Sequence, residues 1–291
     1  MENANPHDLF DTTKRMRRLE RARRRAREDA NFLSDIAATT LSERLQAVNR
    51  GFEFAIDYES LFDNMSDALG KLDQVETQKR IGGLSLKSDP AKGAAEDFKH
   101  LAMNSCDLVT SVFGLHWHNN LPASLAEIAN KLRPDGLFLA ALPGDRTLSE
   151  LRDVLITIES QTTDNVSLRV DPFGEVRQYG ALLQRAGFAL PVVDSEIFTV
   201  RYGSIQKMVG DLRNWGGTSA LKATSLPLNK NQLEMAEQLY RKRYSDPDGR
   251  LRVTYETVFL HGWKPHESQQ KPLSPGTGEI PLGKILGKKT D

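Results

Sequence analysis

Residues 106–142 decide the fold of this chain: they read CDLVTSVFGLHWHNNLPASLAEIANKLRPDGLFLAAL. Cys106–Phe113 is an apolar run with the length of a buried strand, Ser124–Leu132 is typical of a helix, Arg133–Gly136 of a turn, and Leu137–Leu142 of another buried strand. A strand, a helix and a strand in succession predict a right-handed crossover, which sets the two strands parallel in one sheet.

The same alternation of strands and helices extends in both directions from this stretch. Upstream, the pattern predicts a helix over 32–48, a strand over 52–57, a helix through Leu61, Met65 and Leu69, and strands near 74–80 and 84–87. Downstream, it predicts a helix ending at Gly187, a strand over 192–200, a helical stretch over 204–244 and a strand over 254–263. We therefore expect a doubly wound α/β fold with helices on both faces of the sheet.

The chain divides into three parts by composition. Residues 1–50 are predicted to form an N-terminal helical arm, and residues 51–264 the main α/β domain, with 204–244 as a helical insertion. Residues 265–291 are rich in proline and glycine, which predicts a tail that lies extended over the surface.

The overall composition excludes several classes of protein. Lys plus Arg and Asp plus Glu both number 39, so the chain as a whole offers no charge argument for nucleic acid or an anionic membrane as partner. No apolar run approaches the ~20 residues that span a bilayer, and the N-terminus lacks the apolar core of a signal peptide. Cys106 is the single cysteine and lies in a buried strand, so we expect a packed, unreactive thiol and a soluble protein of the reducing cytoplasm.

Residues 14–27 contain the sharpest charge asymmetry in the sequence. They hold nine Lys or Arg, with Glu20 as the one acid, and Leu19, Ala22 and Ala26 form a thin apolar stripe at helical spacing. A basic surface helix is predicted. A nucleic acid or an acidic protein could bind there, but a solvated helix that covers one edge of the fold is the favoured interpretation, and nucleic acid is not an expected partner.

Several short motifs resemble those of the class I S-adenosylmethionine-dependent methyltransferases. The strand CDLVTS, the following GLHWHNNLP, the LRPDG turn and the strand LFLAAL look like the fourth and fifth strands of that family. The LHW and NLP elements, TLSELR at 147–152 and GWKPHESQ near the C-terminus are similar to one subgroup. It contains the biotin-pathway malonyl-carrier-protein methyltransferases and a methyltransferase-like assembly factor of respiratory complex I, and the latter is the closer resemblance.

The resemblance implies a Rossmann-like methyltransferase fold with a seven-stranded mixed sheet. The expected strand order is 3-2-1-4-5-7-6, with the strand at 254–263 antiparallel and 204–244 covering the carboxyl edge as a lid. It also implies cofactor-binding positions at Asp57, Tyr58 and Glu59 after the first strand, at Asp89 after the third, and at Val112 at the end of the fourth. Asp57 is equally interpreted as a helix cap, and Asp89 as a turn residue before Pro90.

The cofactor loop departs from the family pattern. The family has a glycine-rich loop after its first strand, but here the strand AIDY is followed by Glu59, Ser60, Leu61, Phe62 and Asp63. Glycine lets a backbone adopt positive φ and approach a ligand closely, so the side chains of Glu59 and Leu61 should fill that space, and the charges of Glu59 and Asp63 should repel the cofactor's carboxylate. Weak or absent binding of S-adenosylmethionine is therefore expected.

Substrate-binding positions are predicted at His116 and Trp117 in the GLHW segment, and at Arg146 and Arg152 after the fifth strand, where open α/β sheets bind ligands. His116 and His118 have a spacing that a metal site could use, but no third ligand lies close in sequence, so no metal is predicted. Packing is the commoner role of such a tryptophan, and a surface ion pair is the commoner role of such arginines.

Three functional hypotheses remain from the sequence. The first is a binding protein of this family that acts in respiratory complex I assembly, with a complex I subunit as partner and no methyl transfer. The second is an enzyme, either an active methyltransferase or a relative that hydroxylates a protein arginine; no catalytic residue is identifiable. The third is a binding module built on the basic helix.

Overall fold

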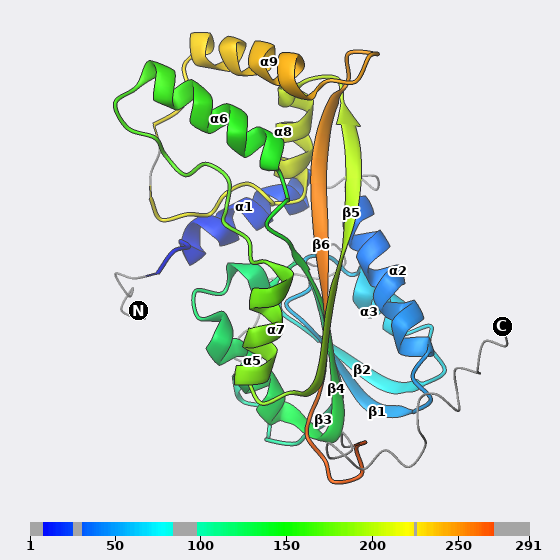
Figure 1. Cartoon of the computed structure of the whole chain (residues 1–291). Coiled ribbons are helices and arrows are strands. Elements are labelled where there is room, and N and C mark those ends of the chain that lie inside the picture. The colour runs from blue at the N-terminus through cyan, green and yellow to red at the C-terminus, as the bar shows by residue number, and fades with distance from the viewer. Residues whose placement is uncertain (1–7, 26–30, 84–97, 224–225, 271–291) are drawn as a thin grey trace, which may run out of the picture.

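The computed structural model describes residues 8–25, 31–83, 98–223 and 226–270. These form one mixed sheet with helices on both faces and a further layer of helices at one end (Figure 1). The strands are β1 Phe52–Tyr58, β2 Val75–Ile81, β3 Cys106–Val112, β4 Leu132–Pro143, β5 Ala189–Tyr202 and β6 Leu251–Trp263. The helices are α1 Thr12–Arg25, α2 Phe32–Gln46, α3 Asn64–Leu69, α5 Leu121–Lys131, α6 Ser149–Thr162, α7 Val176–Arg185, α8 Ile205–Asn214 and α9 Lys230–Tyr244, with a 3-10 turn, η2, at Leu115–Trp117.

The strand order in the described residues is β2-β1-β3-β4-β6-β5. β1 is parallel to β2 and β3, β3 is parallel to β4, and β6 is antiparallel to both β4 and β5. The predicted order of these six strands and the antiparallel direction of the last one are confirmed. The described residues contain six strands where seven were expected, and the predicted strand at 84–87 lies outside them.

Alternation along the strands separates two apolar layers. On β4, Leu137, Leu139 and Ala141 belong to the cluster that packs under α2 and α3. Their neighbours Phe138, Ala140 and Leu142 belong to the cluster under α5 and α7, on the opposite face. Successive side chains of a strand point to opposite faces, so continuous apolar character along β3 and β4 is what a sheet covered on both faces requires (Figure 1).

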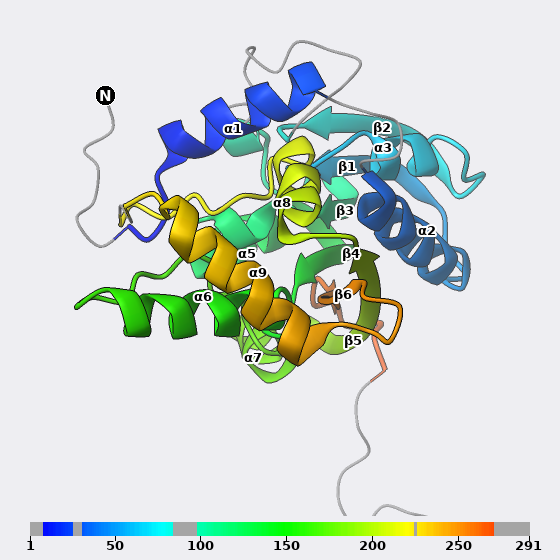
Figure 2. The same ribbon diagram turned by 90° about the horizontal axis from the view of Figure 1, so that it is seen from above.

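A third apolar cluster lies beyond the carboxyl ends of the central strands. Here α1, α6, α8 and α9 pack around the parts of β5 and β6 that extend past the rest of the sheet (Figure 1), and Figure 2 shows these helices from above. Met208 and Leu212 of α8, Tyr240 of α9 and Tyr255 of β6 are buried in it. The helices of the 204–244 stretch therefore cover the carboxyl edge of the sheet, where a lid was expected.

Local sequence explains several helix boundaries. α9 begins with a capping box in which Asn229 and Gln232 each bond the other's backbone N–H, and α7 begins with the equivalent pair Glu175 and Gln178. Gly187 has φ +86° just after α7, a conformation that glycine adopts without strain.

Three sequence-based boundaries differ from the structure. The helix predicted through Leu61 begins only at Asn64, so Leu61 and Phe62 belong to a loop. The turn predicted at Arg133–Gly136 is an irregular beginning of β4, in which Asp135 has φ 64° and the register with β3 shifts. The third difference is α6, Ser149–Thr162, where the sequence pattern predicted no helix.

Candidate functional site

The loop of residues 59–63 joins β1 to α3 at the carboxyl edge of the sheet. The Leu61 N–H donates to the Val112 carbonyl at 2.7 Å, and the Val112 N–H donates to Ser60 Oγ at 2.9 Å. The Glu59 N–H donates to the Ile81 carbonyl at 2.8 Å, which prolongs the ladder between β1 and β2. The loop is therefore bonded directly onto the ends of two strands, in the place where the family resemblance predicts a cofactor.

Asp57 lies at the centre of an internal polar network below this loop. Its carboxylate is fully buried, accepts from Ser60 Oγ, and has the Thr110 hydroxyl at 3.4 Å. Arg80 Nε lies 3.9 Å from Asp57 Oδ2, while its guanidinium pairs with Asp63 and donates to the Ser60 carbonyl at 2.8 Å. Burial, only partly offset by the charge of Arg80, raises the pKa of Asp57 to about 6.

Two glycines show how tightly the loop packs. A Cβ at Gly114 would stand 1.6 Å from the Glu59 carbonyl oxygen, and one at Gly83 would stand 1.8 Å from the Ser60 carbonyl oxygen. The backbone of the loop thus fills the space above β2 and β3 so closely that not even a methyl group fits. Leu61 and Phe62 are each 4% exposed, so their side chains fill the site from within.

Glu59 is held by the N-terminal helix. Its backbone has φ 55°, and its carboxylate pairs with Arg15 of α1 at 3.4 Å. Arg15 Cζ also lies 4.8 Å from the centre of the Trp117 ring, within the range of a cation–π contact. The basic helix therefore packs against the candidate site, which is a tertiary contact that its sequence did not indicate.

A small cavity lies beside the loop, under α8. Its volume is about 60 Å³, which holds a few water molecules, whereas sites for drug-sized ligands have about 300–1,000 Å³. Its apolar lining includes Leu33, Leu61, Phe62, Phe113, Trp117 and Trp215, and its polar lining includes Asn31, His116, Thr147, Asp171 and Glu256. In this conformation the cavity is therefore smaller than the sites that hold drug-sized ligands.

Several residues with unused hydrogen-bonding capacity line this cavity. Trp117 Nε1 donates to Asp171 Oδ2 at 3.0 Å. Asp171 Oδ1, Trp215 Nε1 and His116 Nδ1 are buried, and within the described ranges they have no hydrogen-bond partner. A cavity with such a lining can accept a small polar group, because each buried unpaired donor or acceptor costs free energy until it is paired.

The two histidines of the GLHWH segment point to different surroundings. His116 stacks against Trp117 with ring centres 4.0 Å apart, while His118 Nδ1 lies 2.8 Å from Ser124 Oγ. Burial, followed by the charge of Arg15, lowers the pKa of His116 well below 6.5, and burial lowers the pKa of His118 to about 4. In the part of the chain that the structure describes, no group of three or more His, Cys, Asp or Glu could hold a metal ion.

The predicted site residues separate into three groups. His116 and Trp117 line the cavity, whereas Asp57, Tyr58, Glu59 and Val112 form the closed loop region beside it; Tyr58 is stacked on Phe98 with ring centres 3.9 Å apart. Arg146 and Arg152 do not line the cavity.

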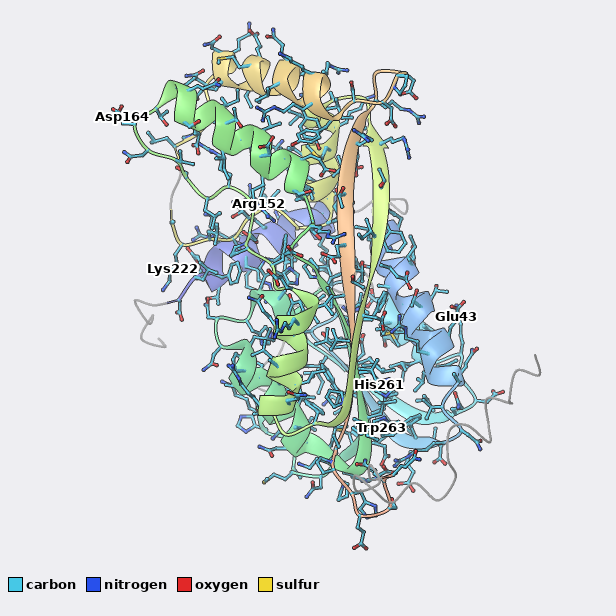
Figure 3. All side chains as sticks on the ribbon, viewed as in Figure 1. Glu43, Arg152, Asp164, Lys222, His261 and Trp263 are labelled. Atoms are coloured by element: carbon cyan, nitrogen blue, oxygen red, sulfur yellow. The ribbon has the colours of Figure 1, made fainter. Side chains whose placement is uncertain are left out.

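Arg146 is exposed, and Arg152, at the beginning of α6 above the sheet, donates to the Asp145 carbonyl at 3.0 Å (Figure 3). Asp89 lies outside the described residues.

Sequence reasoning missed Asp171 and Glu256. Asp171 precedes Pro172, a pairing that signals a turn, and nothing local to either acid indicates that it faces Trp117 or the cavity. Both are brought to the site by tertiary structure, Asp171 by the connection between α6 and α7 and Glu256 by the antiparallel strand β6.

Comparisons with known proteins identify the family. A sequence profile described as a methyltransferase domain matches residues 56–140. The human protein named arginine-hydroxylase NDUFAF5, mitochondrial, is 31% identical over 267 residues, which cover 89% of this chain and 77% of that protein. This chain belongs to the NDUFAF5 family. The resemblance to methyltransferases seen in the sequence is thus confirmed.

Two further comparisons cover other parts of the methyltransferase class. A malonyl-[acyl-carrier protein] O-methyltransferase of Laribacter hongkongensis is 35% identical over 177 residues, covering 60% of this chain and 57% of that protein. A solved S-adenosylmethionine-dependent methyltransferase from Archaeoglobus fulgidus overlaps with a TM-score of 0.40 and 14% identity, over 78% of this chain and 94% of that one. Among the described residues, no helix has the length and apolar character needed to cross a membrane.

Proposed function

We propose that this member of the NDUFAF5 family acts by binding a protein partner in the assembly of respiratory complex I, without transferring methyl groups. The observation that carries the proposal is the closed loop at 59–63, whose backbone leaves no space at Gly83 and Gly114 and whose Leu61 and Phe62 fill the adjoining interior. The carboxylate of Asp57, at the strand end where the family is expected to contact its cofactor, is used internally by Ser60 and Arg80.

Isothermal titration with S-adenosylmethionine and S-adenosylhomocysteine tests the proposal on the purified chain. Overpacking typically costs about 1 to 3 kcal/mol per position, so two filled positions cost about 2 to 6 kcal/mol together and weaken a ligand of ~1 μM dissociation constant to between about 30 μM and about 25 mM. A low-micromolar dissociation constant for the wild-type chain would overturn the proposal and favour an active methyltransferase.

The variant Glu59→Gly, Leu61→Gly, Asp63→Gly provides the comparison. It is expected to bind S-adenosylmethionine more tightly than the wild type, because it removes the two filling side chains and two acidic charges. Since Leu61 is buried and Asp63 pairs with Arg80, circular dichroism must first show that the variant folds. For the partner, an affinity-tagged wild-type chain is expected to retain a subunit of respiratory complex I from solubilised mitochondrial or bacterial membranes.

A second candidate function is hydroxylation of a protein arginine, in which one atom of dioxygen enters a C–H bond and the other leaves as water, with two electrons and two protons from an external reductant. It is favoured by the 31% identity to a protein named as an arginine hydroxylase. It is also favoured by the cavity lined by Trp117, Trp215 and Asp171, because Asp171 Oδ1 has no hydrogen-bond partner in the described ranges and could accept from an arginine side chain. Mass spectrometry of partner proteins recovered with and without this chain tests it. Addition of one oxygen atom to an arginine only in the presence of the chain would establish the activity.

A further inference from the structure

The basic face of α1 forms one wall of a cleft on the side of the helical layer. We define the basic cleft by its six cationic side chains, Lys14, Arg18, Arg21, Arg25, Arg169 and Arg213. The cleft has a volume of about 500 Å³, and Thr218 and Ser219 add hydroxyl groups to its lining. Within the described residues, no acidic side chain lines it. This concentration of one charge contrasts with the neutral balance of the whole chain.

Four of the eight cations of α1 form a single stripe that lines the cleft. Lys14, Arg18, Arg21 and Arg25 follow one another at intervals of four, three and four residues, which places them on one side of the helix. The stripe extends about 16 Å along the helix axis. Leu19 and Ala22 are buried on another side, so packing fixes which face α1 turns toward the cleft.

The cleft is held in shape by contacts on both walls. Leu9–Asp11 pairs with Ala220–Lys222 in a short antiparallel bridge, with the Asp11 N–H donating to the Ala220 carbonyl at 2.8 Å. Lys222 lies at this edge of the molecule, next to α1 (Figure 3). A Cβ on Gly216 would meet Leu19 at 2.8 Å, which shows how closely α1 packs against the end of α8.

Several cations of the cleft have no ion pair within 4.0 Å in the described residues, although Asp171 and Asp11 act electrostatically on Arg18. Arg169 pairs with Glu159 at 2.6 Å, but the part of the chain that the structure describes provides no ion-pair partner within 4.0 Å for Arg18, Arg21 or Arg213. Arg18 Nη1 is buried, with no hydrogen-bond partner among the same residues. A partly buried guanidinium with an unused donor is stabilised when an anion is brought close to it.

The cleft continues into an apolar depression. The two share Arg169, Val209, Arg213, Thr218 and Ser219. Beyond them the depression is lined mainly by apolar side chains such as Leu151, Leu155 and Leu233, and Asp171 is the one acid in its described lining. Leu168 at the rim is 43% exposed, and Leu233 is 50% exposed. A ligand that follows this surface therefore meets a row of cations and then an apolar floor.

We infer that the basic cleft binds an acidic segment of a partner protein, with carboxylates along the stripe of α1 and an apolar side chain in the adjoining depression. A row of cations about 16 Å long matches roughly five residues of extended peptide. No aromatic residue lines the described part of the cleft, whereas proteins that bind single-stranded nucleic acid stack the bases on aromatic rings. The inference rests on the proposed binding function and gives it a surface and a partner chemistry.

The test measures fluorescence anisotropy of a fluorescein-labelled peptide of alternating glutamate and leucine with the full chain. Arg21→Glu with Arg213→Glu is the test variant, since both side chains are exposed and their replacement should not disturb folding. Arg177→Glu with Lys242→Glu makes the same change in net charge at exposed positions outside the cleft. We expect the test variant to weaken peptide binding about tenfold or more and the control variant to leave it nearly unchanged.

Three outcomes would overturn the inference. The first is that the wild-type chain does not bind the peptide, and the second is that the test and control variants lose peptide affinity equally. The third is that polyuridylate or phosphatidylglycerol vesicles bind more tightly than the peptide and lose this binding only in the test variant. Two results together would support it: added salt weakens binding of the glutamate and leucine peptide, and a peptide of alternating lysine and leucine does not bind. Titration of S-adenosylmethionine into the same proteins keeps the two proposals separate, because tight cofactor binding defeats the proposed function without affecting the peptide result.

Discussion

Replacing Asp57 by asparagine is expected to change how the stability of the chain depends on pH. The carboxyl group is fully buried, and its pKa is raised from 3.8 to about 6, mainly by burial. A difference of this size between the folded and unfolded chains corresponds to about 3 kcal/mol. Asparagine keeps the oxygen that accepts from Ser60 and carries no charge that must be buried.

The direction follows from proton binding. Below pH 3.8 the carboxyl is protonated in both the folded and the unfolded chain. Between pH 3.8 and about 6 the unfolded chain loses the proton while the folded chain keeps it, so the free energy of unfolding falls as pH rises. Above about pH 6 the carboxyl is ionised in both the folded and the unfolded chain, so the folded chain bears the full free-energy cost of the buried charge. Relative to Asp57→Asn, the wild type should therefore lose about 3 kcal/mol between pH 3.8 and neutral pH.

Urea unfolding followed by circular dichroism at several pH values between 4 and 7.5 measures this difference. Asp73→Asn is the matched control, since Asp73 is exposed at the surface next to the same sheet. The difference in free energy of unfolding between the wild type and Asp73→Asn should not show the change of about 3 kcal/mol with pH that is expected for Asp57→Asn. If the difference between wild type and Asp57→Asn stays constant within roughly 0.5 kcal/mol over this range, the buried ionised carboxylate is not the cause and the reasoning fails.

The remaining predictions concern three other positions. Gly114→Ala places a methyl group 1.6 Å from the Glu59 carbonyl oxygen, so it should lower the free energy of unfolding by roughly 3 kcal/mol or more in urea; a loss below roughly 1 kcal/mol would show that the loop yields easily. His118 has a pKa lowered to about 4, so stability should fall as pH drops from 6.5 toward 4, and His118→Gln should remove roughly 3 kcal/mol of that fall; an NMR titration of His118 near pH 6.5 would contradict this. Cys106 is buried with its pKa raised to about 12, so Ellman's reagent should react with it only after unfolding, and fast reaction with the native chain would be inconsistent with the structure.

The sequence pattern by itself determined that β3 and β4 are parallel and covered on both faces, whereas the full strand order came from the resemblance to methyltransferases. The continuous apolar runs at Cys106–Phe113 and Leu137–Leu142, with a helix between them, permit few arrangements other than neighbouring parallel strands covered on both faces. The burial of Cys106 also followed from its position in such a run. These features could be predicted because periodicity and crossover handedness are local properties of the chain.

Tertiary structure alone decided the shape of the candidate site. The missing glycines predicted that the space after β1 would be altered, but they did not show that the loop bonds onto Val112, or that Arg15 from the basic helix packs over Trp117 and pairs with Glu59. Likewise, the cations of α1 line a cleft only because Arg169 and Arg213, from distant segments of the chain, form its other side. Contacts between residues far apart in sequence depend on how the helical layer packs on the sheet, and no local pattern encodes that packing.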